Sequence, residues 1–318
     1  CEYENKNKMY LALCSVFTSK SGENATAPHA SRIRYYHSRI AITRRHGLVR
    51  RRLLRQPLPR HRILKRVLVA LAIVLVACVG GFLLWVSDYY HADATAVAVE
   101  QQDSTIEYED HQVIRLLRST AALIFYPGAK VEATAYLPIL EKIRQRCGIT
   151  CILVKMPLNL AILDENAADG VIAAHPEIRT WFVGGHSMGG AMASAYASAH
   201  KDELAGLVLL GAYVYGDYPP ADALTIYGTF SFDLEAETRY EDSVAVIEDG
   251  NHAQFGNYGR QFGDPDATIS ADEQQDEAVD AIAAFVATVV PCAQSPTWRI
   301  PKTVSRITGK RIAHCTER

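Results

Sequence analysis

The longest apolar run of the chain covers residues 67–86, where uncharged and mostly apolar positions follow one another as VLVALAIVLVACVGGFLLWV. A helix of this length crosses the hydrocarbon core of a bilayer. Basic residues crowd its N-terminal side, and Trp85, Tyr89 and Tyr90 stand at its other end like an interfacial aromatic belt. The pattern predicts a transmembrane signal anchor over residues 67–86, in preference to a cleavable signal peptide or a buried core helix.

Charge divides the chain at this run. Residues 1–67 hold 16 Lys and Arg against 3 Asp and Glu, whereas the remainder holds 17 against 32. By the positive-inside rule, the basic arm of residues 1–66 lies in the cytoplasm and the acidic remainder lies outside. We therefore expect a single-pass protein of the cell membrane with the lipid bilayer as a partner, a disordered basic arm and an extracytoplasmic domain. Nucleic-acid binding by the arm is the weaker interpretation, because topology already accounts for its charges.

Beyond residue 90, apolar segments alternate between strand-like and helix-like periods. An antiparallel hairpin is predicted at 104–108 and 112–117, and further strands at 121–126, 151–154, 180–184, 206–210, 223–227 and 243–247. Helices are predicted at 135–145, 166–174 and 188–200, with a last one after the capping box at 270–273. Strands that alternate with helices predict one α/β domain over residues 90–290. Residues 291–318 show no apolar period, and we expect a disordered tail there.

Cysteine usage is sparse. The chain has 7 cysteines. Of those outside the apolar run, Cys147 and Cys151 lie close together in sequence. A disulfide between them and two separate buried thiols are both compatible with an extracytoplasmic domain. Their spacing brings no further Cys or His partner for zinc, so neither a metal nor a cofactor is predicted.

The motif Gly185-His186-Ser187-Met188-Gly189 carries the clearest chemical signal. A β-branched and aromatic stretch precedes it, and small residues with good helix propensity follow it. Strand, sharp turn and helix with Ser at the apex form the context of a nucleophile elbow, with a helix N-terminus beside the place where an oxyanion would form. The sequence therefore predicts Ser187 as a nucleophile, against the alternative of a purely structural Gly- and Ser-rich turn.

Four stretches in this order carry a family resemblance, which covers nearly all of residues 90–290. They are FYPGAKVE (125–132), KMPLNLA (155–161), GGHSMGG (184–190) and GNHAQFG (250–256). Together they resemble the α/β-hydrolase superfamily, and within it the membrane-anchored bacterial group of alpha/beta hydrolase fold-5. The resemblance implies a mostly parallel central sheet flanked by helices.

A serine nucleophile needs a base, and His252 is the candidate. It follows the last predicted strand in a glycine-rich loop, and the order Ser then His fits α/β-hydrolases. The acid is open. The resemblance implies Asp at position 231, where this chain has Ser231. We favour Asp233; the alternatives are Asp217, Glu235, a carboxylate from elsewhere in the chain, and a dyad without a carboxylate.

The oxyanion hole needs two backbone N–H groups. Met188 is expected to supply one, and the loop after strand 121–126, at Gly128 and Ala129, the other. About a dozen residues separate strands 206–210 and 223–227, which leaves little room for a lid and predicts a shallow site.

These features predict a serine hydrolase, carboxylesterase-like, that cleaves an ester-like bond of a small molecule through an acyl-Ser187 intermediate. No obligate protein partner is evident from the sequence. The alternative is a membrane-anchored protein that keeps the hydrolase fold for binding without catalysis, because fold alone does not fix function.

Overall fold

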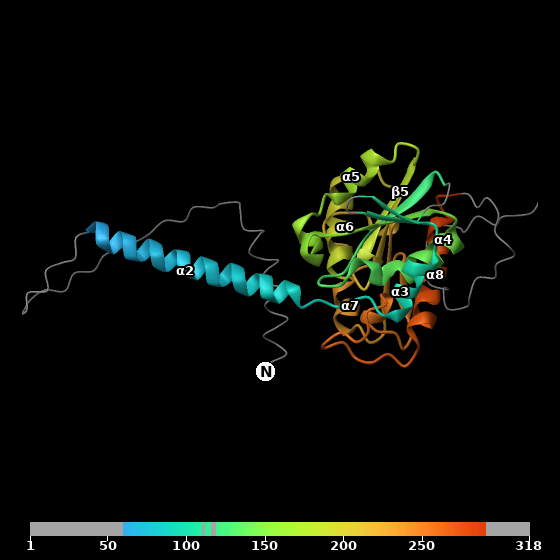
Figure 1. Cartoon of the computed structure of the whole chain (residues 1–318). Helices are drawn as coiled ribbons and strands as arrows, with labels where there is room; N and C mark the ends of the chain where they lie inside the picture. The colour runs from blue at the N-terminus through green and yellow to red at the C-terminus, as the bar shows by residue number, and fades with distance from the viewer. Residues whose placement is uncertain (1–59, 110–111, 116–118, 291–318) are drawn as a thin grey trace, which may run out of the picture. The chain divides into compact units, whose positions relative to one another are not determined.

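The computed structural model describes residues 60–109, 112–115 and 119–290 (Figure 1). The predicted disordered tail and all but the last residues of the basic arm lie outside these ranges. The side chains of residues 112–115, Phe232 and Asp233 are likewise outside the description.

The described residues form one sheet in the order β1-β2-β4-β3-β5-β6-β7-β8. The pairs β1–β2 and β2–β4 are antiparallel and all other neighbours are parallel. The strands are β1 (Ile106–Glu109), β2 (Gln112–Arg115), β3 (Ala121–Tyr126), β4 (Thr150–Val154), β5 (Thr180–His186), β6 (Gly206–Leu210), β7 (Ala223–Gly228) and β8 (Val244–Ile247). This order confirms the predicted α/β-hydrolase fold class, including the opening hairpin.

Helices cover both faces of the sheet (Figure 1). The longer ones are α2 (Arg60–Ser87), α3 (Ala94–Gln102), α4 (Leu137–Cys147), α5 (Ala167–Ala174), α6 (Met188–Ala199), α7 (Phe232–Glu237) and α8 (Ala271–Val286). Short 3₁₀ turns are η1 (Ala133–Tyr136), η2 (Pro157–Asn159), η3 (Ala161–Leu163), η4 (Pro220–Asp222) and η5 (Ala253–Phe255). Successive β3 residues alternate between two buried clusters: Leu123 and Phe125 pack with α4 and α8, and Ala122 and Ile124 pack with α5 and α6.

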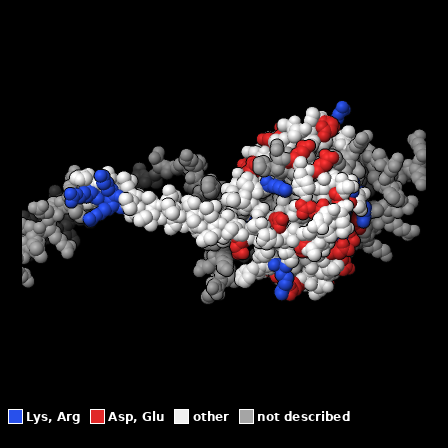
Figure 2. Space-filling view, viewed as in Figure 1, with Lys and Arg blue, Asp and Glu red and all other residues white. Residues whose placement is uncertain are grey.

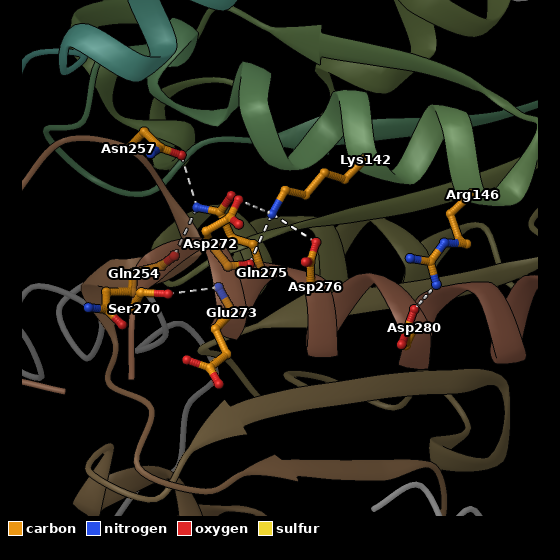
Figure 3. A network of polar contacts seen from close by, with 10 residues as sticks. All are labelled: Lys142, Arg146, Gln254, Asn257, Ser270, Asp272, Glu273, Gln275, Asp276 and Asp280. Atoms are coloured by element: carbon orange, nitrogen blue, oxygen red, sulfur yellow. Dashed lines mark hydrogen bonds and ion pairs between the residues drawn. The ribbon is translucent and has the colours of Figure 1, made fainter. Parts of the chain in front are cut away.

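Ion pairs join α4 to α8 on the outer side of their contact (Figure 3). Lys142 Nζ lies 2.7 Å from Asp272 and 2.9 Å from Asp276, and Arg146 pairs with Asp280. Exposed pairs of this kind contribute about 0–1 kcal/mol each, so the buried apolar faces beneath them hold the helices together. The pairs fix the register that brings the N-terminus of α8 to the loop after β8.

Helix α2 is long and apolar enough to cross a membrane: an 18-residue window within residues 61–87 has a mean hydropathy of 3.0, and no residue of that window is buried in the protein. Its N-terminal turns carry Arg62, Lys65 and Arg66, and the rest of its surface in Figure 2 is uncharged. The helix extends several residues upstream of the predicted span at 67–86, because the basic segment continues it.

Two helices of the described residues were not predicted from the sequence. Helix α3 has alternating Ala and Val with no helical apolar stripe, and Asp93 starts it by accepting bonds from Thr95 and Ala96 N–H (2.8 and 3.0 Å). Helix α7 has six residues and lies in a segment predicted as a loop. The pair Cys147 and Cys151, left open by sequence, is not joined by a disulfide.

Candidate active site

Ser187 lies in the turn between β5 and α6, where the carboxyl ends of the parallel strands meet. Its backbone angles are φ 53° and ψ −123°, a left-handed conformation that residues with side chains rarely adopt. Ser187 N–H donates to the Leu210 carbonyl, and Ala191 N–H donates to the Ser187 carbonyl, both at 3.0 Å. Strain of this kind costs on the order of 1–3 kcal/mol and persists where its surroundings enforce it. The predicted nucleophile thus has the backbone geometry of a nucleophile elbow.

The glycines around Ser187 permit close packing of three backbone segments. A Cβ on Gly185 would lie 2.5 Å from the Tyr126 carbonyl oxygen, and one on Gly189 would collide with the carbonyls of Tyr126 and Pro127. The end of β3 therefore touches the elbow directly. This contact brings the loop after β3, with the predicted oxyanion-hole residues, beside Ser187.

Gly128 and Ala129, the two residues of that loop expected to donate an N–H group to an oxyanion, differ in their hydrogen bonding. Gly128 N–H donates to the Tyr136 hydroxyl at 3.1 Å, so it is engaged within the protein. Ala129 is the next residue of the loop and remains a candidate donor. Met188 begins α6, and the first N–H groups of a helix have no intrahelical partner.

A buried chain of hydrogen bonds connects this loop to the elbow and to the His252 loop. The Tyr136 hydroxyl lies 2.7 Å from His186 Nδ1, and His186 Nε2 lies 3.0 Å from the His252 carbonyl oxygen. A carbonyl only accepts, so Nε2 carries the proton of His186, and Nδ1 accepts from the Tyr136 O–H. With Gly128 N–H as the first donor, every link of the chain has a defined direction.

His186 is the centre of this chain and stays neutral. Its side chain is buried, and burial lowers its pKa well below the usual 6.5. The neighbouring His252 lowers the pKa further, and only the bond to the His252 carbonyl opposes this. A neutral His186 has one donor and one acceptor nitrogen, which is what its two partners require.

The His252 ring lies over the ends of β5 and β6. It packs against the His186 ring with centroids 4.6 Å apart, and a Cβ on Gly211 would meet His252 Nδ1 at 2.9 Å. His186 immediately precedes Ser187 and pairs with Leu210 in the sheet. The structure therefore brings the predicted base to the residue next to the predicted nucleophile, across more than sixty residues of sequence.

A carboxylate holds the backbone of His252. Asp264 accepts from the N–H groups of His252 (3.2 Å) and Ala253 (2.8 Å) with its two oxygens. Burial lowers the pKa of His252 below 6.5, and the negative charge of Asp264 acts in the opposite direction. Asp264 thus orients the loop and moderates the loss of basicity caused by burial.

Two buried glutamines at the start of α8 complete the support of this loop. Gln274 accepts from Asn251 N–H (3.0 Å) and donates to the Asn251 carbonyl (2.8 Å). Gln275 donates to the Gln254 carbonyl (3.1 Å) and to Asn257 Oδ1 (2.9 Å; Figure 3). Both sides of His252 are therefore bonded to one helix.

The three acid candidates differ in position. Asp233 lies in the first turn of α7, and Phe230 N–H in the preceding loop donates to the Gly250 carbonyl at 3.0 Å, so this loop runs beside that of His252. Asp217 is 79% exposed and pairs with Lys201 at 2.7 Å, while Glu235 is exposed on α7. Ser231, where the resemblance implies Asp, is buried, and its hydroxyl has no hydrogen-bond partner among the described residues.

Sequence reasoning missed four residues that hold the site: Tyr136, His186 as a bridge, Asp264 and Gln274. Tyr136 had a weak signal, since a tyrosine at the start of a predicted helix beside the FYPGAK loop offers a polar end near Gly128. The others had none, because their partners are distant in sequence.

A depression of about 330 Å³ is lined mainly by residues of 251–271 and by Asp93, and Ser187 does not line it. Within the described ranges, no group of three or more His, Cys, Asp and Glu is placed to hold a metal ion.

The match to a family model agrees with this architecture. The model of the alpha/beta hydrolase family matches residues 122–276. No curated protein sequence matches the chain. Similar solved structures include a hormone-sensitive lipase from a metagenome library (13% identity, TM-score 0.40, 62% of this chain and 92% of that one). Others are carboxyl esterase 2 from Tuber melanosporum (9%, 0.41, 64% and 92%) and the Bacillus cereus carboxylesterase (13%, 0.33, 58% and 99%).

The family match spans the elements that build the site, from β3 through the elbow and the His252 loop to the start of α8. Residues 122–276 thus match the alpha/beta hydrolase family, and the described domain has the fold of that family.

Proposed function

We propose that this protein is a serine esterase in which Ser187 attacks the ester carbonyl and His252 acts as general base. The observation that carries the proposal is the strained Ser187 turn with the His252 ring packed on the preceding residue. His252 takes the proton of Ser187 as Oγ bonds to the carbonyl carbon, and returns it to the departing alcohol. Water then repeats these steps on the acyl-Ser187 ester and releases the acid.

The oxyanion of each tetrahedral intermediate would bind to the N–H groups of Met188 and Ala129. Gly128 is the weaker candidate, because its N–H donates to Tyr136. Donors of this kind contribute roughly 3–4 kcal/mol to transition-state stabilisation. An ester is favoured as substrate because an alcohol is a better leaving group than an amine.

We assign the orienting acid to Asp233, whose loop runs beside the His252 loop. Asp217 is a weaker candidate, since its carboxylate is committed to a surface pair with Lys201. The pKa of Asp217 is lowered, first of all by its hydrogen bond to that lysine.

The apolar helix α2 is proposed to span the cell membrane, with its basic N-terminal end in the cytoplasm and the catalytic domain outside. Its length, its apolar composition and the basic residues at its N-terminal end support this orientation.

A second candidate function is binding without catalysis. It is favoured by Ser231, which stands in the place of the expected acid with a buried hydroxyl that has no described partner. Activity measurements separate the two candidates.

Removal of either reacting group should abolish turnover. In the full chain in detergent, Ser187→Ala and His252→Ala should each lower kcat for a simple aryl ester by a factor on the order of 10⁶. His200→Ala, which removes an imidazole paired with Glu203 at the end of α6, is the control and should keep wild-type turnover. Wild-type rates in Ser187→Ala would exclude this nucleophile.

Neutralising the orienting acid should have a large effect at one position. Asp233→Asn should lower kcat by roughly 10⁴-fold with unchanged thermal stability, because the His252 ring loses its orientation. Asp217→Asn and Glu235→Gln remove exposed carboxylates and should stay within about tenfold of wild type. If all three variants keep their activity, the assignment of Asp233 is wrong and the enzyme uses another carboxylate or none.

The bridge through Tyr136 should matter for catalysis beyond its effect on stability. Tyr136→Phe removes the hydroxyl that joins Gly128 N–H to His186, and each buried group left unpaired costs about 1–3 kcal/mol. We expect kcat for the aryl ester to fall by roughly 10²-fold, with little change in KM, because the loops shift relative to Ser187.

Tyr126→Phe is the matched control for this variant. The Tyr126 hydroxyl is also internally bonded, accepting from Ala168 N–H (2.8 Å) and donating to the Glu165 carbonyl (3.0 Å), but it lies at α5. Its loss should destabilise the fold comparably and leave kcat near wild type. Equal kcat losses in the two variants would refute a positioning role for Tyr136.

A further inference from the structure

Three apolar side chains face outward between β4 and α5. Leu158 is 45% exposed, Ile162 37% and Leu163 50%; we call these three residues the apolar rim. Leu160 and Ala161, which lie between them, and Met156, which precedes them, are buried, and Met156 and Ala161 belong to the core cluster beside α5 and α6. The segment is therefore packed down on one side, and the exposure of the rim does not come from loose packing.

The backbone of this segment is held in an unusual conformation. Leu158 and Asn159 have φ of 53° and 55°, in the left-handed region. Hydrogen bonds enforce it: Asn159 N–H donates to the Met156 carbonyl (3.1 Å), and the Asn159 carbonyl accepts from Lys130 N–H (2.8 Å). A leucine held outward in this way is maintained by its surroundings, and such outliers motivate a functional hypothesis.

Lys130 connects the segment of the apolar rim to the residues that follow α2. Its carbonyl accepts from Tyr90 N–H (2.7 Å), three residues after α2 ends at Ser87. Its ammonium lies 4.7 Å from the centre of the Trp85 ring, and α2 itself contacts η2. At about 3.3 Å per residue, Tyr90 is within roughly 10 Å of the end of α2 along the chain.

Lys130 also follows Gly128 and Ala129, the loop proposed for the oxyanion hole. The end of the apolar helix, the apolar rim and the edge of the catalytic site thus meet at one residue.

We propose that the apolar rim inserts into the bilayer surface and holds the catalytic site against it, so that the enzyme takes an amphiphilic, long-chain ester directly from the membrane. This rests on the proposed esterase function and on α2 spanning the bilayer. A bilayer is the occupant favoured over a protein, because α2 has an unburied apolar window long enough to span one, and α2 contacts η2, the turn that carries Leu158.

The test compares two substrates in the full chain reconstituted in phosphatidylcholine vesicles. One is a water-soluble short-chain aryl ester, and the other is a long-chain acyl ester dissolved in the vesicles. The variant combines Leu158→Ser, Ile162→Ser and Leu163→Ser. We expect its turnover of the vesicle-bound ester to fall at least about tenfold, and its turnover of the soluble ester to stay within about twofold.

The control is Val289→Ser, which removes an exposed apolar side chain (42%) close in sequence to Phe285, whose ring lies beside Gly206 at the N-terminal end of β6, whereas Ser187 follows the C-terminal end of β5. It should change neither rate. A triple variant that loses both rates equally, or neither, overturns the proposal. If the wild type cleaves neither ester, the proposed function itself fails, which is a separate outcome.

A second measurement does not depend on activity. Leu163→Trp and Val289→Trp are compared in vesicles that contain brominated lipid, which quenches tryptophan at the bilayer surface. Quenching of the added tryptophan should be stronger at position 163. Equal quenching at both positions, or cross-linking of the rim to a second copy of the chain, overturns the bilayer contact.

Discussion

The site depends on one hydrogen bond, from His186 Nε2 to the carbonyl of His252. This bond joins the end of β5 to the loop after β8. On its other side, the neutral His186 ring accepts from the Tyr136 hydroxyl, which in turn accepts from Gly128 N–H. Because His186 is buried and its pKa is held low, the bond keeps one tautomer and one direction across ordinary pH. The proposed nucleophile, base and oxyanion loop are therefore connected by a single polar chain within an apolar core.

Contacts from other elements of the fold hold this hydrogen-bonded chain in place. The glycines of the elbow let β3 approach α6, and α8 reaches across the sheet edge to bond the backbone on both sides of His252. On the other side, Lys130 links the oxyanion loop to the residues that leave α2. The contacts around the proposed oxyanion loop and those that join the domain to the residues after the apolar helix are thus only a few residues apart.

Local patterns were sufficient for most of the fold. Strand β3 and β6 have the predicted bounds, since short apolar runs bounded by turn residues determine them. The motif and the chain order predicted Ser187 in a sharp turn and His252 in a loop near it, and the structure has both features, while their catalytic roles stay predictions. Tyr136, Asp264 and Gln274 could not, since their roles arise from hydrogen bonds to backbone groups brought near by folding. The acid stays open for the same reason: Ser231 departs from the expected pattern, and sequence offers several carboxylates nearby.

The measurement that tests the account most directly is covalent labelling with a fluorophosphonate, which reacts with a serine only when a neighbouring base activates it. The labelled full-length protein is digested, and the modified peptide is identified by mass spectrometry. The account predicts modification of Ser187, with the label lost when His252 is replaced while the fold is retained. A label on another serine, or labelling of Ser187 that persists without His252, would contradict it.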